Sequence, residues 1–292
     1  MDRVLKKISI IAAVVLMIGL SGNAALFMFG QRNGTYMAAG QTRISDTYMV
    51  KSSAAKNLEI AISSGDVRVL RSDVAYPTIR ISGWSPAGNL QTEDLVQEEM
   101  RGDILYLKIG NQKKWLDSLL FPFWGKGPKI SFELLLPPQE YDALTLHLSS
   151  GSLVIDSLGT GLLKVTMSSG RLEMGNCKAD EISVIASSGH VELKNTTGKL
   201  TVESSSGHVE VSLNELVNDA VFQSESGYLA IHVGAVSTPF RVEAMALSGK
   251  VDVDLPKAGY QVHGTNSFQG HSGQGDGPLV KVAVSSGHAR IW

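Results

Sequence analysis

The sequence predicts an all-β fold: a parallel, β-helix-like β-solenoid with coils of about 19 residues, behind an N-terminal transmembrane helix. Three observations lead to this prediction. A Ser-Gly pair recurs at a nearly constant interval, apolar residues alternate with polar ones on both sides of it, and a long apolar run follows basic residues at the N-terminus. Thirty glycines against nine prolines also fit a chain with many tight turns.

The N-terminus has the pattern of a signal anchor. Three basic residues lie within positions 1–7, and the apolar run covers residues 8–29. At ~1.5 Å per residue, a helix over this run reaches across a hydrocarbon core of ~30 Å. Because basic residues are sparse after the run, we expect a single-pass protein of the cell membrane, with residues 1–7 cytoplasmic and the bulk of the chain extracytoplasmic. Alternatively, Gly22-Asn23-Ala24 resembles a signal-peptide cleavage site, and cleavage would release a secreted form.

The repeat is centred on glycines that follow serine. Successive glycines from position 151 to 249 are 19, 19, 18, 20 and 22 residues apart, and the last gap is 38 residues, twice nineteen. Positions three, five and seven before each glycine, and two and four after it, are apolar at all but two of forty sites, Ser204 and Ser224. Such alternation indicates strands with one buried face. The eight glycines are Gly65, Gly151, Gly170, Gly189, Gly207, Gly227, Gly249 and Gly287.

The buried side of the alternation switches at each glycine, from odd offsets before it to even offsets after it. A straight strand cannot do this, so Ser-Ser-Gly predicts a bend between two strands. Glycine supplies the backbone freedom of a sharp bend, and the serine hydroxyls can bond nearby backbone groups. Two strands with a shared apolar side make one coil. Stacking of such coils ~4.8 Å apart would bury their apolar side chains. An antiparallel sandwich of hairpins is the alternative, but it does not require nearly identical coils at constant spacing.

The chain divides into segments of different regularity. Residues 30–50 are polar and are expected to form a tether between the membrane and the folded part. Residues 51–140, with one repeat unit and a short predicted helix over 92–100, are expected to form irregular first coils with excursions that cap the stack; a separate small β domain is the alternative. Residues 141–292 hold the regular coils, and the glycine-rich segment 263–279 is expected to be a mobile excursion within the last repeat.

Composition excludes several kinds of partner and cofactor. With 26 basic and 28 acidic side chains the net charge is −2, so no nucleic acid or other polyanion is expected to bind. Cys177 is the single cysteine, which excludes an intramolecular disulfide and a cysteine-based zinc cluster. We expect no cofactor.

An anchored N-terminus followed by repeated SGxVxV strands resembles the bacterial putative-adhesin family, a group of β-strand-repeat proteins. The anchored layout is particularly similar to the LiaG-like proteins, which are encoded in a cell-envelope stress operon of Gram-positive bacteria. The resemblance covers roughly residues 50–292. It implies a β-repeat fold, a location at the cell envelope and a link to envelope stress, and it carries no catalytic residues to this chain.

The positions one and three residues after each glycine should share one outer face of the solenoid. Basic or imidazole side chains would form one column there and carboxylates a second, so the favoured interpretation is a solvated, charge-balanced face. The alternatives are a zinc ion held by His190, His208, Glu192 and Glu210, and recognition of a partner by this face. The first column would be Arg171, His190 and His208, and the second Glu173, Glu192 and Glu210.

Catalysis is not expected. A catalytic serine needs a base within hydrogen-bond reach, but in the Ser-Ser-Gly repeats the histidine is optional and the glycine is not. Glycosidases need two carboxylates beside a cleft, and the chain has no compact aspartate cluster and only 7% aromatic residues. The sequence therefore predicts a non-enzymatic, adhesin-like interaction module, with a glycan-binding or glycan-cleaving solenoid as the alternative.

The segment 113–129 has the strongest pattern of a contact site. Lysines flank a cluster of tryptophan, leucine and phenylalanine, a combination that suits a membrane interface. The favoured interpretation is nevertheless a plug for the open apolar end of the solenoid, because terminal coils must be capped; membrane contact and a site for an envelope protein or cell-wall component are the alternatives. The candidate contact residues are Trp115, Leu116, Leu119, Leu120, Phe121, Phe123 and Trp124.

Overall fold

The computed structural model describes residues 42–51, 55–85, 92–110, 129–233, 236, 238–255, 258–273 and 277–292. These residues form an all-β structure with one short helix, α2 (Thr92–Leu95). The strands are β1 (Thr42–Met49), β2 (Asn57–Ile62), β3 (Asp66–Arg71), β4 (Thr78–Ser85), β5 (Val96–Arg101), β6 (Ile104–Ile109), β7 (Lys129–Leu136), β8 (Tyr141–Leu148), β9 (Ser152–Asp156), β10 (Gly159–Met167), β11 (Arg171–Gly175), β12 (Lys178–Ala186), β13 (His190–Lys194), β14 (Thr197–Ser212), β15 (Ala220–His232), β16 (Phe240–Ala246), β17 (Lys250–Val253), β18 (Ala258–His263), β19 (Ser267–Ser272), β20 (Leu279–Val284) and β21 (His288–Ile291).

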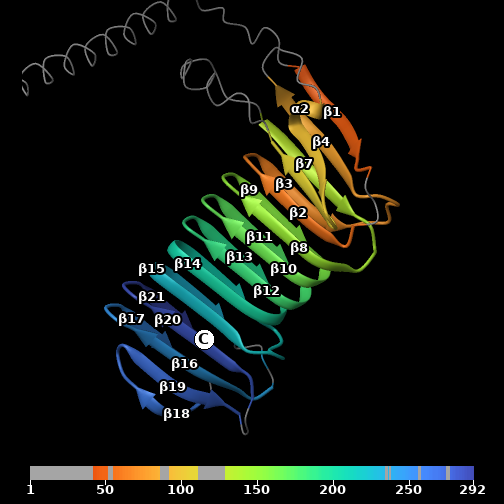
Figure 1. The fold of residues 1–292 in the computed structure, drawn as a ribbon. Coiled ribbons are helices and arrows are strands. Elements are labelled where there is room, and N and C mark those ends of the chain that lie inside the picture. Colours follow the sequence, from red (N-terminus) through yellow and green to blue (C-terminus); the bar gives the residue numbers. More distant parts are fainter. Residues whose placement is uncertain are drawn as a thin grey trace, which may run out of the picture. The chain divides into compact units, whose positions relative to one another are not determined.

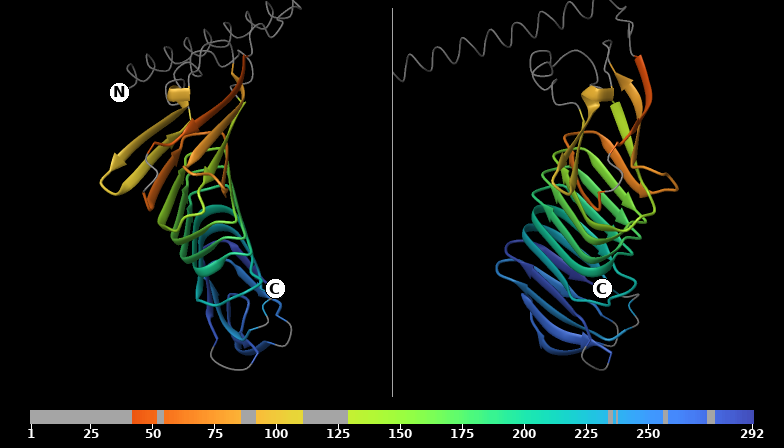
Figure 2. Two further views of the ribbon diagram at one scale, coloured as in Figure 1. Left: turned by 90° about the vertical axis from the view of Figure 1, so that its right-hand side faces the viewer. Right: turned by 45° about the vertical axis from the view of Figure 1, so that its right-hand side comes forward.

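Successive coils stack in parallel and form two walls (Figures 1 and 2). The first wall contains β2, β8, β10, β12 and the first halves of β14 and β15. The second wall contains β3, β9, β11, β13 and the second halves of β14 and β15. The parallel pairing confirms the solenoid over the antiparallel sandwich. In β14 and β15 the ladder also continues through the bend, because Ser206 pairs with Ser226 and Gly207 with Gly227.

The core lies between the two walls and follows the predicted pattern. All forty pattern positions are buried except Val253, which is partly buried. Equivalent residues of neighbouring coils pair, as Val165 does with Val184. The two polar exceptions, Ser204 and Ser224, are also buried and pair with each other. Repetition of one register down the stack therefore explains why the sequence repeats its apolar positions.

The order of the coils in the stack differs from their order in the chain. The last coil of the chain, β20 and β21, is inserted between the coil of β15 and the coil of β16 and β17. At the other end β6 pairs with β2 and β7 pairs with β3. The β2–β3 coil therefore lies between the β6–β7 coil and the β8–β9 coil. The segment expected to be a mobile excursion in the last repeat instead contains most of an antiparallel hairpin, β18 and β19, which extends the first wall beyond β16.

Antiparallel strands also extend the N-terminal end of the stack. β5 pairs with β6, β4 with β7, and β1 with β4. The helix predicted over 92–100 is wrong beyond Leu95, because Val96 to Arg101 gain ladder hydrogen bonds to β6 that outweigh local helix propensity. The tether prediction is wrong for residues 42–49, because they form β1 and pair with β4.

Within the described ranges no helix is long and apolar enough to cross a membrane. The predicted anchor, residues 8–29, lies outside the described residues, as do residues 30–41 of the predicted tether.

Candidate functional site: the outer face of the second wall

The Ser-Ser-Gly bends are built by main-chain and serine hydrogen bonds between coils. The Ser188 hydroxyl donates to the carbonyl of Ser168 at 3.1 Å, and the Ser206 hydroxyl to the carbonyl of Ser187 at 3.3 Å. Gly189 has φ of +109°, a conformation that side chains with a Cβ rarely adopt. These serines connect neighbouring coils. The residue after each glycine, such as His190, points outward on the second wall.

Four outward side chains form a continuous column of rings across β13, β14, β15 and β21. The rings of His190 and His208 are stacked with centroids 5.0 Å apart and planes inclined by 4°. His208 stacks on Tyr228 at 5.0 Å and 21°, and Tyr228 meets His288 edge to face at 5.4 Å. We call His190, His208, Tyr228 and His288 the ring column. The predicted neighbours Arg171, His190 and His208 are confirmed as one column by the strand register.

A column of carboxylates runs beside the rings, as the sequence predicts. Glu173, Glu192 and Glu210 occupy paired positions on β11, β13 and β14. Arg171 bridges two of them, with its Nη2 3.0 Å from Oε2 of Glu192, and Lys194 forms an ion pair with Glu192. The charges of this part of the face therefore neutralise one another in local pairs.

The ionisation of two groups is shifted by this packing. Burial lowers the pKa of His190, and the nearby Arg171 and His208 add to the effect. The hydrogen bond from Lys194 lowers the pKa of Glu192. At neutral pH, His190 is therefore an uncharged imidazole that can both donate and accept a hydrogen bond, beside an ionised carboxylate.

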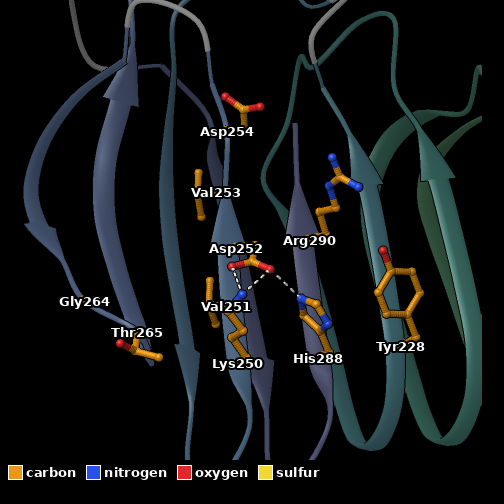
Figure 3. Close-up of a pocket in the computed structure, with 10 residues that line it drawn as sticks. All are labelled: Tyr228, Lys250, Val251, Asp252, Val253, Asp254, Gly264, Thr265, His288 and Arg290. Atoms are coloured by element: carbon orange, nitrogen blue, oxygen red, sulfur yellow. Dashed lines mark hydrogen bonds and ion pairs between the residues drawn. The ribbon is translucent and has the colours of Figure 1, made fainter.

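The column ends in a groove on the C-terminal side of the face (Figure 3). Asp252 accepts from His288 Nε2 at 2.9 Å, and its other oxygen lies 2.7 Å from Lys250 Nζ. Tyr228, Arg290 and Thr265 are among the residues that line the groove. The groove thus continues the ring column across β21 and β17 to the turn between β18 and β19.

A second pair of rings lies on the same face, two positions beyond Ala230 and Arg290. The rings of His232 and Trp292 are stacked at 5.4 Å, and the Arg290 guanidinium lies 5.3 Å from the Trp292 ring. Between the two sets of rings, Ala230 occupies the position that Glu210 and Arg290 hold on the neighbouring strands. Ala230 itself is buried, with 4% of its surface exposed, so neighbouring side chains cover this position.

The geometry gives no support to the zinc hypothesis for His190, His208, Glu192 and Glu210. The imidazole–carboxylate distances within each strand are 3.9 Å, and the two imidazoles turn their faces toward each other rather than converging their nitrogens. A zinc ligand would lie at ~2.0–2.2 Å from one shared ion. Within the part of the chain that the structure describes, no group of three or more His, Cys, Asp or Glu side chains is placed to hold a metal.

Sequence reasoning missed a second ladder, at the other bend of the coil. Asn176 donates to Asp156, Asn195 to Asn176, and Asn214 to Asn195, at 3.0, 3.2 and 2.5 Å. Asn176 and Asn195 have φ of 53° and 52°. The sequence contained a signal for this second bend. Asn176 and Asn195 both stand six residues after a repeat glycine, and asparagine tolerates the left-handed conformation.

The aromatic contact residues predicted within 113–129 lie outside the described residues. Of this segment only the backbone of Lys129 is described, where β7 begins.

Comparison with known proteins identifies the family. The model of the Toastrack DUF4097 family matches residues 48–291, and the chain belongs to this family. A comparison with curated proteins gave no match.

Solved structures with a similar fold are distant. A "putative lipid binding protein" from Parabacteroides distasonis is 16% identical over 85% of this chain and 96% of its own, with a TM-score of 0.47. A "putative adhesin" from Bacteroides fragilis is 14% identical over 86% and 97%, with a TM-score of 0.41. A "putative cell adhesion protein" from Clostridium sporogenes is 13% identical over 86% and 99%, with a TM-score of 0.35. Likenesses this remote carry no argument about function.

Proposed function

We propose that the chain is a single-pass membrane protein that holds its solenoid outside the cell and acts by binding, not by catalysis, at the bacterial cell envelope. The observation that carries this proposal is the outer face of the second wall, where main-chain pairing fixes ring and ion-pair side chains in register on a rigid surface. The charged run before residues 8–29 and the resemblance to LiaG-like proteins support the location and a link to envelope stress.

The bends favour binding over serine chemistry. A nucleophilic serine requires a hydrogen bond to its base, but the Ser188 and Ser206 hydroxyls donate to main-chain carbonyls of the preceding coil. The histidine that follows the second bend, His208, stacks between two rings instead. The serine–glycine repeat is therefore used to turn the chain.

The N-terminal end of the solenoid supports a membrane contact by residues 113–129. Thr42, the first described residue of the chain, pairs with Ser85, and the adjacent Trp84 pairs with Lys129. The point where the chain enters the fold therefore lies beside the end of the aromatic segment. Trp84 is itself 51% exposed at this corner. We propose that Trp115, Phe121, Trp124 and their apolar neighbours meet the bilayer here.

Cysteine labelling of the full-length protein in cells tests both parts of the proposal. Burial raises the pKa of the native Cys177 thiol to about 11, so the unmodified chain should react little with maleimide. Glu203→Cys, on an exposed position of the first wall, should react with a membrane-impermeant maleimide in intact cells. Labelling of this variant only after permeabilisation, or its recovery from the culture medium, would contradict an anchored, extracytoplasmic solenoid.

The matched variant for the aromatic segment is Trp124→Cys. If this position lies in the bilayer, the thiol should be protected in intact cells and should react after mild detergent. Protection that persists in detergent would favour the plug at the solenoid end, and immediate labelling would refute both interpretations.

A further inference from the structure

We infer that the outer face of the second wall binds a neutral, linear polysaccharide, laid along the ring column with its chain across the strands. This inference deepens the proposed function, because it names the ligand class and the site of an extracytoplasmic binding module. Three independent features of the face lead to it: the period of its side chains, its charge balance and its paired sets of rings.

The period of the face fits a repeating ligand. The centroids of the ring column are 5.0, 5.0 and 5.4 Å apart, close to the ~4.8 Å spacing of the strands that carry them. A compact ligand would use one or two such positions. A polymer that presents the same chemical group at regular intervals can use all of them, and each added contact contributes to one binding event.

The charge of the face favours a neutral polymer over a polyanion. The outward positions of β11, β13, the second halves of β14 and β15, β21 and β17 carry four basic side chains and four carboxylates, and Asp254, directly after β17, adds a fifth carboxylate at the groove. Polyanion binding depends on unpaired lysine and arginine that displace counterions, whereas Arg171, Lys194 and Lys250 already form ion pairs on this face. The basic residues are Arg171, Lys194, Lys250 and Arg290, and the acidic ones Glu173, Glu192, Glu210 and Asp252.

The chemistry of the face matches a hydroxyl-rich chain. Imidazole and phenol edges offer both donors and acceptors, and the carboxylates beside them accept from hydroxyls. Tyr228 lies on one side of the buried Ala230, and the stacked His232 and Trp292 lie on the other. Ligand sites combine such apolar ring surfaces with a few fixed polar groups. The groove at Asp252 and Thr265 extends the same line by one further coil.

A purely structural role of the ring column is the competing explanation, since stacked rings also stabilise parallel strands. The two roles differ in what a surface substitution changes. Loss of a binding contact weakens binding while the unfolding midpoint is kept, whereas loss of a structural ladder lowers the unfolding midpoint and changes binding only as the fold is lost.

The test measures binding of the full-length protein in mild detergent to three neutral β-1,4-linked hexasaccharides: chitohexaose, cellohexaose and mannohexaose. At least one should bind more tightly than its trisaccharide, and heparin, a polyanion, should bind less. Tyr228→Ala and His208→Ala should each weaken binding about tenfold, the scale of one aromatic contact. Glu210→Gln, which keeps the side-chain volume, should weaken binding without moving the unfolding midpoint.

The matched control is His147→Ala on the first wall. The His147 side chain is 43% exposed, against 41% for His208, and it too lies near a glutamate, 3.6 Å from Glu59. This variant should bind normally. The inference is wrong if none of the three hexasaccharides binds, if heparin binds more tightly than all of them, or if His147→Ala weakens binding as much as His208→Ala. Cysteine labelling of Glu203→Cys is unaffected by these results, so the two proposals can fail separately.

Discussion

Gly189→Ala probes the bend on which the whole architecture depends. Gly189 has φ of +109°, and a Cβ placed there would lie 2.9 Å from the backbone nitrogen of Gly170 and closer still to its carbonyl oxygen. The obstacle is the backbone of the neighbouring coil, which cannot rotate away as a flexible side chain would. The substitution therefore combines a strained backbone with a clash between two stacked coils.

The magnitude follows from these two contributions. Placing a residue with a Cβ in a left-handed conformation costs roughly 1–2 kcal/mol, and forcing extra volume into a packed site costs roughly 1–3 kcal/mol. We expect Gly189→Ala to lower the free energy of unfolding by about 2–5 kcal/mol. Two other glycines separate the contributions. Gly102 has φ of +66° with nothing within 4 Å of its Cβ position, and Gly159 has neither positive φ nor a neighbour within 4 Å.

Urea denaturation followed by circular dichroism measures all three variants. Gly159→Ala should leave the unfolding midpoint nearly unchanged, Gly102→Ala should lower the free energy of unfolding by about 1–2 kcal/mol, and Gly189→Ala should lower it most. Because stacked repeats can unfold in parts, the transition of each variant is to be fitted with and without an intermediate. If Gly189→Ala costs no more than Gly102→Ala, the bend does not need glycine for close approach of the coils, and our explanation of the repeat is wrong.

Two further predictions concern the second bend and the ring column. Asn195→Ala loses both the ladder hydrogen bonds and a residue suited to φ of 52°, and should cost about 1–3 kcal/mol in urea unfolding, whereas Asn195→Gly should recover the part due to φ; equal losses would refute the role of the backbone. Because the pKa of His190 is lowered, the unfolded chain binds its proton at higher pH than the folded chain, and stability should fall as pH decreases below about 6.5. His190→Gln should flatten this fall in stability below about pH 6.5, and an unchanged slope would contradict this assignment.

The interior of the solenoid could be predicted because one register repeats. Equal spacing of the glycines forces equivalent positions to pair, so Leu163 and Ile182 had to lie side by side once stacking was assumed. The same logic gave the outward columns of Arg171 and His190 without any knowledge of the fold. To predict which residues are buried, it is enough to know which side of each strand faces the core, and the alternation of apolar and polar residues shows that side.

The order and direction of the end strands could not be predicted. The 38-residue gap before Gly287 is equally compatible with a coil at the end of the stack and with one inserted inside it, because both bury Val282 and Ile291. Apolar residues recur at every second position over 78–82 and 104–109, which indicates strands, and the structure contains them as part of β4 and as β6. Their pattern does not reveal that β4 runs antiparallel to β7, because alternation is the same in both directions.

The insertion of the last coil is also what completes the binding face. If the coils stacked in chain order, Lys250 would follow Tyr228 and Asp252 would lie beside Ala230. Instead β21 lies between β15 and β17, so His288 becomes the fourth ring and its imidazole bonds to Asp252. The residues that line the groove then come from the coils at Gly227, Gly249 and Gly287, together with the turn at Thr265. The fourth ring and the groove therefore depend on β21 lying between β15 and β17, so the polysaccharide binding that we propose would also report on the correct stacking of this end.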